Sequence, residues 1–157
     1  MFSLHNKVIV LTGATGALGG SLVLSLTEAK AKIVILGRNQ SLLDALLTKI
    51  SPSTESAAFV VDVLDKKSLE EVKNQIIKQF GHIDILINAV GGNLPGAVIA
   101  YDQSIFDLSV PDFDEVMDLN LKGTVLPSLV FGKSMSEKGK GAIVNYSSMT
   151  VDQALTR

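Results

Sequence analysis

The stretch KVIVLTGATGALGG (Lys7–Gly20) decides the fold of this chain. Its first six residues form a short apolar run rich in β-branched side chains, which predicts a strand covered on both faces. Closely spaced glycines follow, and Leu18, Leu22 and Leu26 then recur with the period of a helix. A strand, a glycine-rich turn and a helix in this order predict the beginning of a parallel α/β sheet.

The rest of the chain repeats this alternation of strands and helices. Short apolar runs of the same kind predict four further strands, at Lys32–Leu36, Ala57–Val61, Ile83–Asn88 and Gly141–Asn145. We therefore expect residues 1–157 to form one α/β domain, the five-strand N-terminal portion of a doubly wound parallel sheet.

Apolar stripes with helical spacing fill the gaps between these strands. The first helix is predicted to carry the stripe from Leu18 to Ala29, and the second is predicted around Leu42–Ile50. The third is predicted to begin at Asp65 or Ser68 as N-cap and to end at Gly81. The fourth is predicted to run from Pro111 past Asn120 toward Met135, with a kink at Pro127.

Composition excludes several classes of function. The 157 residues carry a formal charge of −2 and no cysteine, which excludes disulfides, thiolate metal sites and cysteine nucleophiles. No basic surface is indicated, so we expect no nucleic-acid binding. No apolar run is long enough for a bilayer span or a signal peptide, so we expect no membrane association and a cytoplasmic location. His5 and His82 are isolated, and we expect no metal site.

Glycines and polar residues directly follow several predicted strands, where doubly wound sheets bind their ligands. The glycine turn after the first strand predicts a pyrophosphate site, because glycines let the anion approach backbone N–H groups at a helix N-terminus. A glycine-rich connection without a ligand is the alternative. The predicted dinucleotide-binding residues are Thr12, Gly13, Thr15, Gly16, Ala17, Leu18, Gly19, Arg38, Asp62, Val63, Asn88, Ala89, Val90 and Gly91.

The residues after the second strand bear on which dinucleotide is bound. An acid at this position usually accepts hydrogen bonds from the ribose 2′-OH of NAD. Gly37 offers no carboxylate here, and the guanidinium of Arg38 suits a 2′-phosphate. This pattern favours NADP(H) over NAD(H), although a solvated loop arginine is the alternative.

Taken together, these motifs resemble the short-chain dehydrogenase/reductase family over essentially the whole chain. The matching pieces, in family order, are TGATGALG, the Asp62-Val63 pair, NAVGG from Asn88, NLKG from Asn120 and IVNYSS. The resemblance implies a Rossmann-type oxidoreductase that moves a hydride between a nicotinamide and a small carbonyl or alcohol substrate. It also implies that Ser148 bonds the substrate oxygen and that Asn120 anchors a water in a proton relay, with Ser147 the less favoured hydroxyl.

The spacing of the glycines departs from the common family pattern, since Ala17 stands where the middle glycine is usual. That spacing is closer to the family's epimerase branch, but NAVGG and NLKG argue against it. It also resembles the branch called D-mannonate oxidoreductase, which suggests a keto sugar acid as substrate. The segment from Asn93 to Asp112 is expected to handle the substrate, yet it contains no basic residue to pair with a carboxylate.

The family's acid/base pair, a tyrosine and a lysine four residues later, has no match in this chain. Tyr101 and Tyr146 are followed at that distance by Ile105 and Thr150. We therefore expect a domain that is incomplete at its C-terminus, binds dinucleotide weakly and turns over no substrate by itself. We also expect the fifth strand to become an exposed sheet edge.

Two readings of different classes remain open. The first is an oxidoreductase whose full-length form is active, as a homo-oligomer (dimer or tetramer). The second is a non-catalytic dinucleotide-binding module or redox sensor. The joint presence of Asn120 and Ser148 favours the enzyme. A sugar-nucleotide epimerase rests on the glycine spacing alone.

Overall fold

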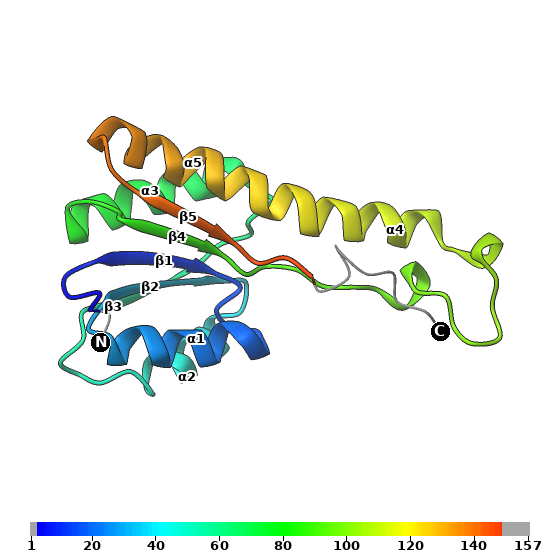
Figure 1. Ribbon diagram of the computed structural model, residues 1–157, viewed down its shortest axis with the longest axis horizontal. Helices are drawn as coiled ribbons and strands as arrows, with labels where there is room; N and C mark the ends of the chain where they lie inside the picture. Colours follow the sequence, from blue (N-terminus) through cyan, green and yellow to red (C-terminus); the bar gives the residue numbers. More distant parts are fainter. Residues whose placement is uncertain (1–2, 149–157) are drawn as a thin grey trace.

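A single parallel sheet organises the protein, as the computed structural model shows for residues 3–148 (Figure 1). Its strand order is β3-β2-β1-β4-β5, and every neighbouring pair is parallel. This confirms the predicted doubly wound α/β architecture. The strands are β1 (Val8–Thr12), β2 (Lys32–Gly37), β3 (Ser56–Val60), β4 (Ile85–Asn88) and β5 (Ala142–Asn145).

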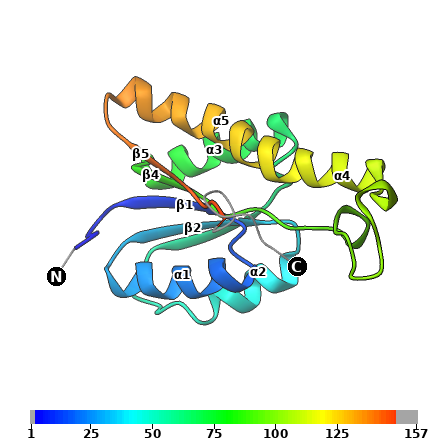
Figure 2. The same ribbon diagram turned by 45° about the vertical axis from the view of Figure 1, so that its right-hand side comes forward.

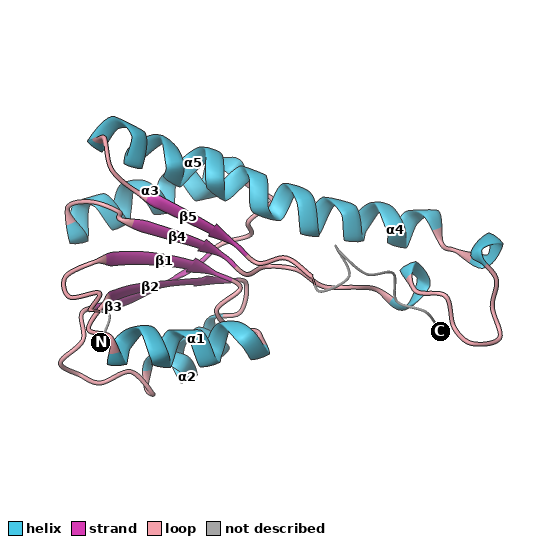
Figure 3. Ribbon diagram, in the orientation of Figure 1, coloured by secondary structure: helices cyan, strands magenta, loops and turns pink. Residues whose placement is uncertain are grey.

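Helices cover both faces of the sheet (Figure 3). On one face lie α1 (Ala17–Glu28) and α2 (Gln40–Leu47), and on the other lie α3 (Lys66–Phe80) and α5 (Gly123–Lys138). The helix α4 (Val110–Met117) continues through a short π-helical turn, η3 (Asp118–Lys122), into α5. Both views show α4 projecting beyond the carboxyl edge of the sheet together with the connection that precedes it (Figures 1 and 2).

Alternate residues of β1 feed two separate cores. Val8 and Val10 pack with side chains from α3 and α5, whereas Ile9 and Leu11 pack with side chains from α1 and α2. All four side chains are fully buried. Burial of each such side chain contributes about 1.5–3 kcal/mol, so β1 anchors both layers of helices to the sheet.

Side-chain caps fix where three of the helices begin. Asn39, Asp65 and Ser109 each accept hydrogen bonds from backbone N–H groups in the first turn of α2, α3 and α4. These caps satisfy donors that have no partner within the helix. The predicted start of the third helix at Asp65 and its end at Gly81 are both confirmed, with Gly81 at φ +84°.

β4 begins two residues later than the apolar run predicted, at Ile85 rather than Ile83. The carboxylate of Asp84 accepts the Val8 N–H at 3.0 Å. Because a side chain rather than a backbone carbonyl takes this donor, the regular ladder between the two strands starts only at Ile9 and Ile85. The starts of β3 and β5 each differ by one residue from prediction.

The long helix contains an irregularity that the sequence did not predict. Pro127, the predicted kink position, lies inside α5, and the helical hydrogen-bonding pattern changes earlier, at the π-helical turn η3. A π-turn inserts an extra residue into the helix and turns nearby side chains. In this helix, the turn contains Asn120.

β5 forms one edge of the sheet, as expected. Its side chains are exposed, including Ile143 at 41% and Val144 at 47%. Among residues 3–148, no helix combines the length and apolarity that a bilayer crossing needs.

Candidate functional site

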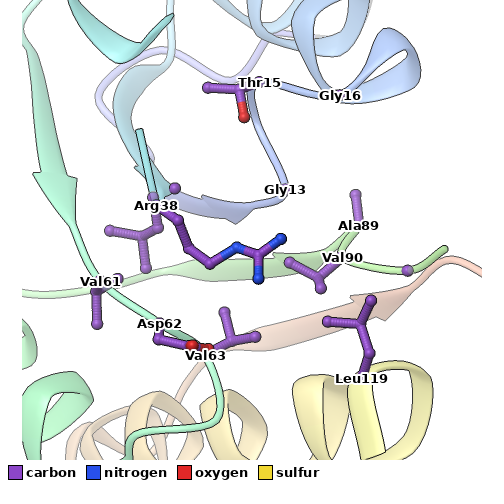
Figure 4. A pocket seen from close by; sticks show the side chains of 13 residues that line it. Gly13, Thr15, Gly16, Arg38, Val61, Asp62, Val63, Ala89, Val90 and Leu119 are labelled. Carbon is purple, nitrogen blue, oxygen red and sulfur yellow. The ribbon is translucent and has the colours of Figure 1, made fainter. Parts of the chain in front are cut away.

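A pocket of about 220 Å³ opens at the carboxyl ends of β1, β2, β3 and β4 (Figure 4). Its position is the edge where the sequence placed a ligand, at the junction where strand order reverses between β1 and β4. The structure brings nine predicted residues to its wall. The lining residues are Gly13, Thr15, Gly16, Leu36, Gly37, Arg38, Val61, Asp62, Val63, Ala89, Val90, Gly91 and Leu119.

The turn after β1 brings two backbone segments unusually close together. Gly13 has φ +68°, and a Cβ there would lie 2.4 Å from the carbonyl oxygen of Ala89. A Cβ on Gly19 would lie 2.2 Å from the carbonyl oxygen of Gly13, so α1 packs directly on the turn. Gly13 therefore needs glycine both for its positive φ and for its close contact with Ala89, whereas Gly19 needs glycine only for its close contact with the turn.

The N-terminus of α1 has no side-chain cap, unlike those of α2, α3 and α4. Its N-cap is Gly16, whose N–H donates to the Gly13 carbonyl at 3.0 Å. Ala17 and Leu18 do not line the pocket, and Leu18 is 68% exposed. What the first turn of α1 offers the pocket is backbone N–H groups, which suit an anion.

Arg38 extends its side chain into the middle of the pocket (Figure 4). None of the ion pairs among residues 3–148 involves this guanidinium, so its charge is available to a ligand. Asp62, on the opposite wall, accepts the Leu64 N–H at 2.9 Å. A Cβ on Gly37 would lie 3.3 Å from Leu43, so an acidic side chain there would crowd α2.

Two predicted residues lie behind the pocket and hold its walls. Thr12 is fully buried, and its hydroxyl accepts the Ala89 N–H at 3.3 Å. Asn88 is 1% exposed, and its amide nitrogen donates to Ser128 and to Asn145, each at 2.9 Å. The side-chain oxygen of Asn88 is buried without a hydrogen-bond partner. Asn88 thereby joins the ends of β4 and β5 to α5.

Asn120 fastens the loop after β4 to the π-turn. Its side-chain oxygen accepts the Gly92 N–H at 3.1 Å, and its amide nitrogen donates to the Gly92 carbonyl at 2.9 Å. A Cβ on Gly91 would lie 2.7 Å from the same oxygen. Asn120 therefore fixes the segment that forms one wall of the pocket.

The hydroxyls after β5 lie at the same edge of the sheet. The Tyr146 N–H donates to the Asn88 carbonyl at 2.9 Å and directs the chain toward Ser147 and Ser148, which are exposed. Tyr101, by contrast, is 95% exposed on the connection before α4. Thr150 lies outside the described residues.

Sequence reasoning missed some residues of this site. Leu119 and Val61 line the pocket, but each belongs to an apolar stripe or run that predicts only packing. Ser128, which accepts a hydrogen bond from Asn88, was also missed, although its spacing from Asn120 could have indicated it. Asn120, Thr124 and Ser128 are spaced four residues apart, and each hydroxyl donates to the carbonyl one turn earlier.

A buried carboxylate stabilises the opposite, amino-terminal edge of the sheet. Burial raises the pKa of Asp84, but hydrogen bonds from Lys138 at 2.7 Å and from the Val8 N–H, together with the charge of His82, outweigh it and lower the pKa to about 2. This cluster also accounts for His82, which lies 3.0 Å from the carboxylate.

Comparisons with known proteins agree with the site. A family model described as short chain dehydrogenase matches residues 7–156. The chain is 35% identical over 164 residues to an uncharacterized oxidoreductase, UxuB, of Bacillus subtilis, covering 99% of this chain and 59% of the relative. It is 32% identical over 155 residues to D-threitol dehydrogenase of Mycolicibacterium smegmatis, covering 98% and 57%.

A solved structure resembles this one closely. It comes from Haemophilus influenza, is described as a candidate D-mannonate oxidoreductase, and has NAD bound. The TM-score is 0.88 with 36% sequence identity, and the match covers 99% of this chain and 59% of that chain. The chain thus spans between 57% and 59% of the length of these relatives.

Proposed function

Because the chain belongs to the short-chain dehydrogenase family, we propose that it forms the cofactor-binding part of an oxidoreductase acting on a carbonyl or alcohol substrate. The observation that carries the proposal is the pocket at the carboxyl edge, where Gly13, the uncapped N-terminus of α1 and Arg38 converge. Glycine contacts and backbone N–H groups suit a pyrophosphate, and a free guanidinium suits a further phosphate.

The residues present fit a nicotinamide dinucleotide, which when bound supplies the hydride donor or acceptor. In this proposal the turn at Gly13 and the first turn of α1 bind the pyrophosphate, and Asp62 accepts from the adenine amino group. Ser148 donates a hydrogen bond to the substrate oxygen. Asn120 holds a water that relays the proton to or from that oxygen, while its side chain keeps Gly92 in place.

We further propose that NADP(H) is preferred over NAD(H). Arg38 is the support, since its charge has no ion-pair partner in residues 3–148, and Gly37 places no carboxylate beside it to repel a 2′-phosphate. The similar structure has NAD bound, so the two dinucleotides are compared directly in the test below.

The substrate class we propose is a polyhydroxylated carbonyl compound or its alcohol, with a keto sugar acid as the specific candidate. D-threitol dehydrogenase and the D-mannonate oxidoreductase structure support a polyhydroxylated substrate. Residues 93–112 contain no Lys, Arg or His, so a substrate carboxylate must be bound by residues elsewhere.

A non-catalytic dinucleotide-binding module is the second candidate. It needs only the glycine turn and Arg38, and Gly13, Gly16 and Arg38 all line the pocket. Such a module binds the dinucleotide through the same pocket but has no use for Asn120 and Ser148 as a catalytic pair.

Titration of NADPH and NADH into the purified protein, followed by nicotinamide fluorescence, tests the binding proposal. We expect both to bind, NADPH more tightly, and the Arg38→Ala substitution to weaken NADPH about 10-fold or more with little effect on NADH. Gly13→Ala should abolish binding of both, because its Cβ meets the Ala89 carbonyl. Gly139→Ala is the matched control, since Gly139 also has a positive φ, +74°, but has open space where the Cβ would lie.

If neither NADPH nor NADH binds, the proposed function is contradicted. If the two bind equally well, both to the parent protein and to Arg38→Ala, only the NADP(H) preference is contradicted.

Turnover separates the enzyme from the binding module. The full-length natural protein, rather than these 157 residues alone, is incubated with NADP⁺ or NAD⁺ and with D-mannonate or D-threitol, and reduced cofactor is followed by absorbance. Dinucleotide binding without turnover of any alcohol or ketone substrate favours the module.

A further inference from the structure

A clasp closes the connection between β4 and α4. The Ser109 N–H donates to the Gly96 carbonyl at 2.9 Å, and the Gly96 N–H donates to the carboxylate of Asp112 at 3.1 Å. The second carboxylate oxygen of Asp112 accepts from the Ser109 hydroxyl at 3.1 Å. Three residues from both ends of the connection are thus joined at one point.

Gly96 belongs to the clasp because nothing larger fits there. A Cβ at this position would lie 2.3 Å from the Asp112 carboxylate and 2.9 Å from Cβ of Ser109. The close approach of backbone and carboxylate therefore depends on both Gly96 and Asp112.

The loop that the clasp closes, residues 97–108, has its own internal order. Gln103 accepts the Ala100 N–H at 2.9 Å, and Ser104 and Asp107 form a reciprocal capping box. The loop nevertheless packs little against the rest of the protein, since Tyr101 and Phe106 are each 95% exposed. A compact loop with adjoining ends and an exposed tip is the form that many functional surface loops take.

The clasp is connected to the cofactor pocket by a short stretch of chain. Gly91 lines the pocket, Gly92 is bonded to Asn120, and Gly96 enters the clasp. The α4–η3 helix therefore holds this stretch at two points, with Asn120 on the cofactor side and Asp112 on the loop side.

We propose that loop 97–108 recognises the polyhydroxylated substrate and that Asp112 is a positioning residue, which holds this loop through the Gly96 contact. The proposal rests on the proposed function and extends it to substrate recognition. Because none of Gly96, Ser109 and Asp112 lines the cofactor pocket, Asp112 sets the KM for the alcohol or ketone and leaves cofactor affinity to the pocket.

Kinetics of the whole protein with the better of D-mannonate and D-threitol test this role. We expect Asp112→Ala to raise KM about 10-fold, the effect of losing roughly one charge-assisted hydrogen bond, with kcat and the cofactor Kd within about twofold. Asp112→Asn should restore most of the KM, since its oxygen can accept the Gly96 N–H and its nitrogen can donate to Ser109. Gly96→Ala should reproduce Asp112→Ala by opening the clasp from the other side.

Asp114→Ala is the matched control. Asp114 is a second aspartate on α4, but it is exposed and does not contact Gly96. An unchanged KM in both Asp112→Ala and Gly96→Ala overturns the proposal, as does an equal loss of cofactor affinity. If no alcohol is turned over, the proposed function fails, and hydrogen exchange tests the positioning role instead. An added alcohol should slow exchange in residues 97–108 of the parent protein but not of Asp112→Ala. If the two proteins do not differ in this way, the positioning role is overturned.

Discussion

Asp84 illustrates how a single buried residue, through its side chain and its backbone, can join β1, β5 and α5 to the start of β4. Its carboxylate bonds the start of β1 through Val8 and the end of α5 through Lys138. Its backbone carbonyl accepts the Ala142 N–H at 3.0 Å, at the start of β5. A buried carboxylate is stable only when its partners supply what water supplied, and here they do so well enough to keep it ionised.

The pH dependence of stability should report on Asp84 directly. Its pKa is about 2 in the folded protein and 3.8 in the free side chain, so the unfolded state binds its proton first. The stabilisation is therefore fully present above about pH 4 and is lost as pH falls toward 2. We expect Asp84→Asn to lower the free energy of unfolding at pH 7 by about 2 kcal/mol.

Urea unfolding between pH 2 and 7 measures this effect. The difference between the parent and Asp84→Asn proteins should shrink as pH falls below 4, whereas Asp114→Asn should match the parent throughout. A difference that is the same at pH 2.5 and pH 7 contradicts the assignment.

At the scale of elements, the π-turn η3 carries Asn120, which contacts both its own helix and the loop after β4. Residues on a regular α-helix meet neighbours three or four positions away on the same face. Asn120 bonds both the Val116 carbonyl, one turn earlier, and the backbone of Gly92, 28 residues away in sequence. The turn thus lets one side chain serve both its own helix and the loop after β4.

Removal of this side chain should loosen the loop more than the helix. We expect Asn120→Ala to lower the free energy of unfolding by about 1 kcal/mol, because the lost hydrogen bonds are solvent-exposed. The Gly92 amide should exchange hydrogen markedly faster in the variant, as followed by NMR. Thr124→Ala, which removes a bond within the same helix and spares the loop, is the control. Unchanged protection of Gly92 in Asn120→Ala contradicts this assignment.

The elements themselves were largely predictable from local pattern. Buried strands appear as apolar runs, and Asp65 and Gly81 mark the ends of α3 because capping chemistry is local. The late start of β4 was not predictable, since it depends on partners of Asp84 that include Lys138, 54 residues away. The π-turn was also missed, because no residue in Asp118–Lys122 marks such a turn in the way that a proline marks a possible kink.

The candidate site divides in the same way. Residues that follow strands at the carboxyl edge, such as Gly13, Arg38 and Gly91, were predicted because parallel topology alone brings them together. Thr12 and Asn88 belong to the same edge but face inward, a distinction that sequence does not make. The clasp at Gly96 depends on how the chain reverses direction between β4 and α4, for which residues 93–109 give no pattern.

At the scale of the whole molecule, β5 leaves one edge of the sheet open. It pairs with β4 on one side, and within residues 3–148 no strand pairs with its other side. Unpaired N–H and C=O groups beside exposed apolar side chains favour pairing with another chain.

We expect the 157-residue protein to self-associate with rising concentration, and Val144→Lys to reduce that association by placing a charge on the edge strand. Sedimentation velocity over a concentration series measures both. Leu42→Lys, a similar change at a 53% exposed position on α2, is the control. Equal effects of the two substitutions argue that association does not use β5.

The division of β1 between two cores has a consequence for how such a protein can change over evolutionary time. One inserted residue within Val8–Thr12 exchanges the alternating side chains between the two cores, so both layers of helices lose their partners at once. One inserted residue within 97–108 enlarges the loop between Gly96 and Ser109, whose contact closes it, and disturbs neither core. Lineages built on this plan are therefore free to vary the length of that loop, while the strands tolerate almost no change in length.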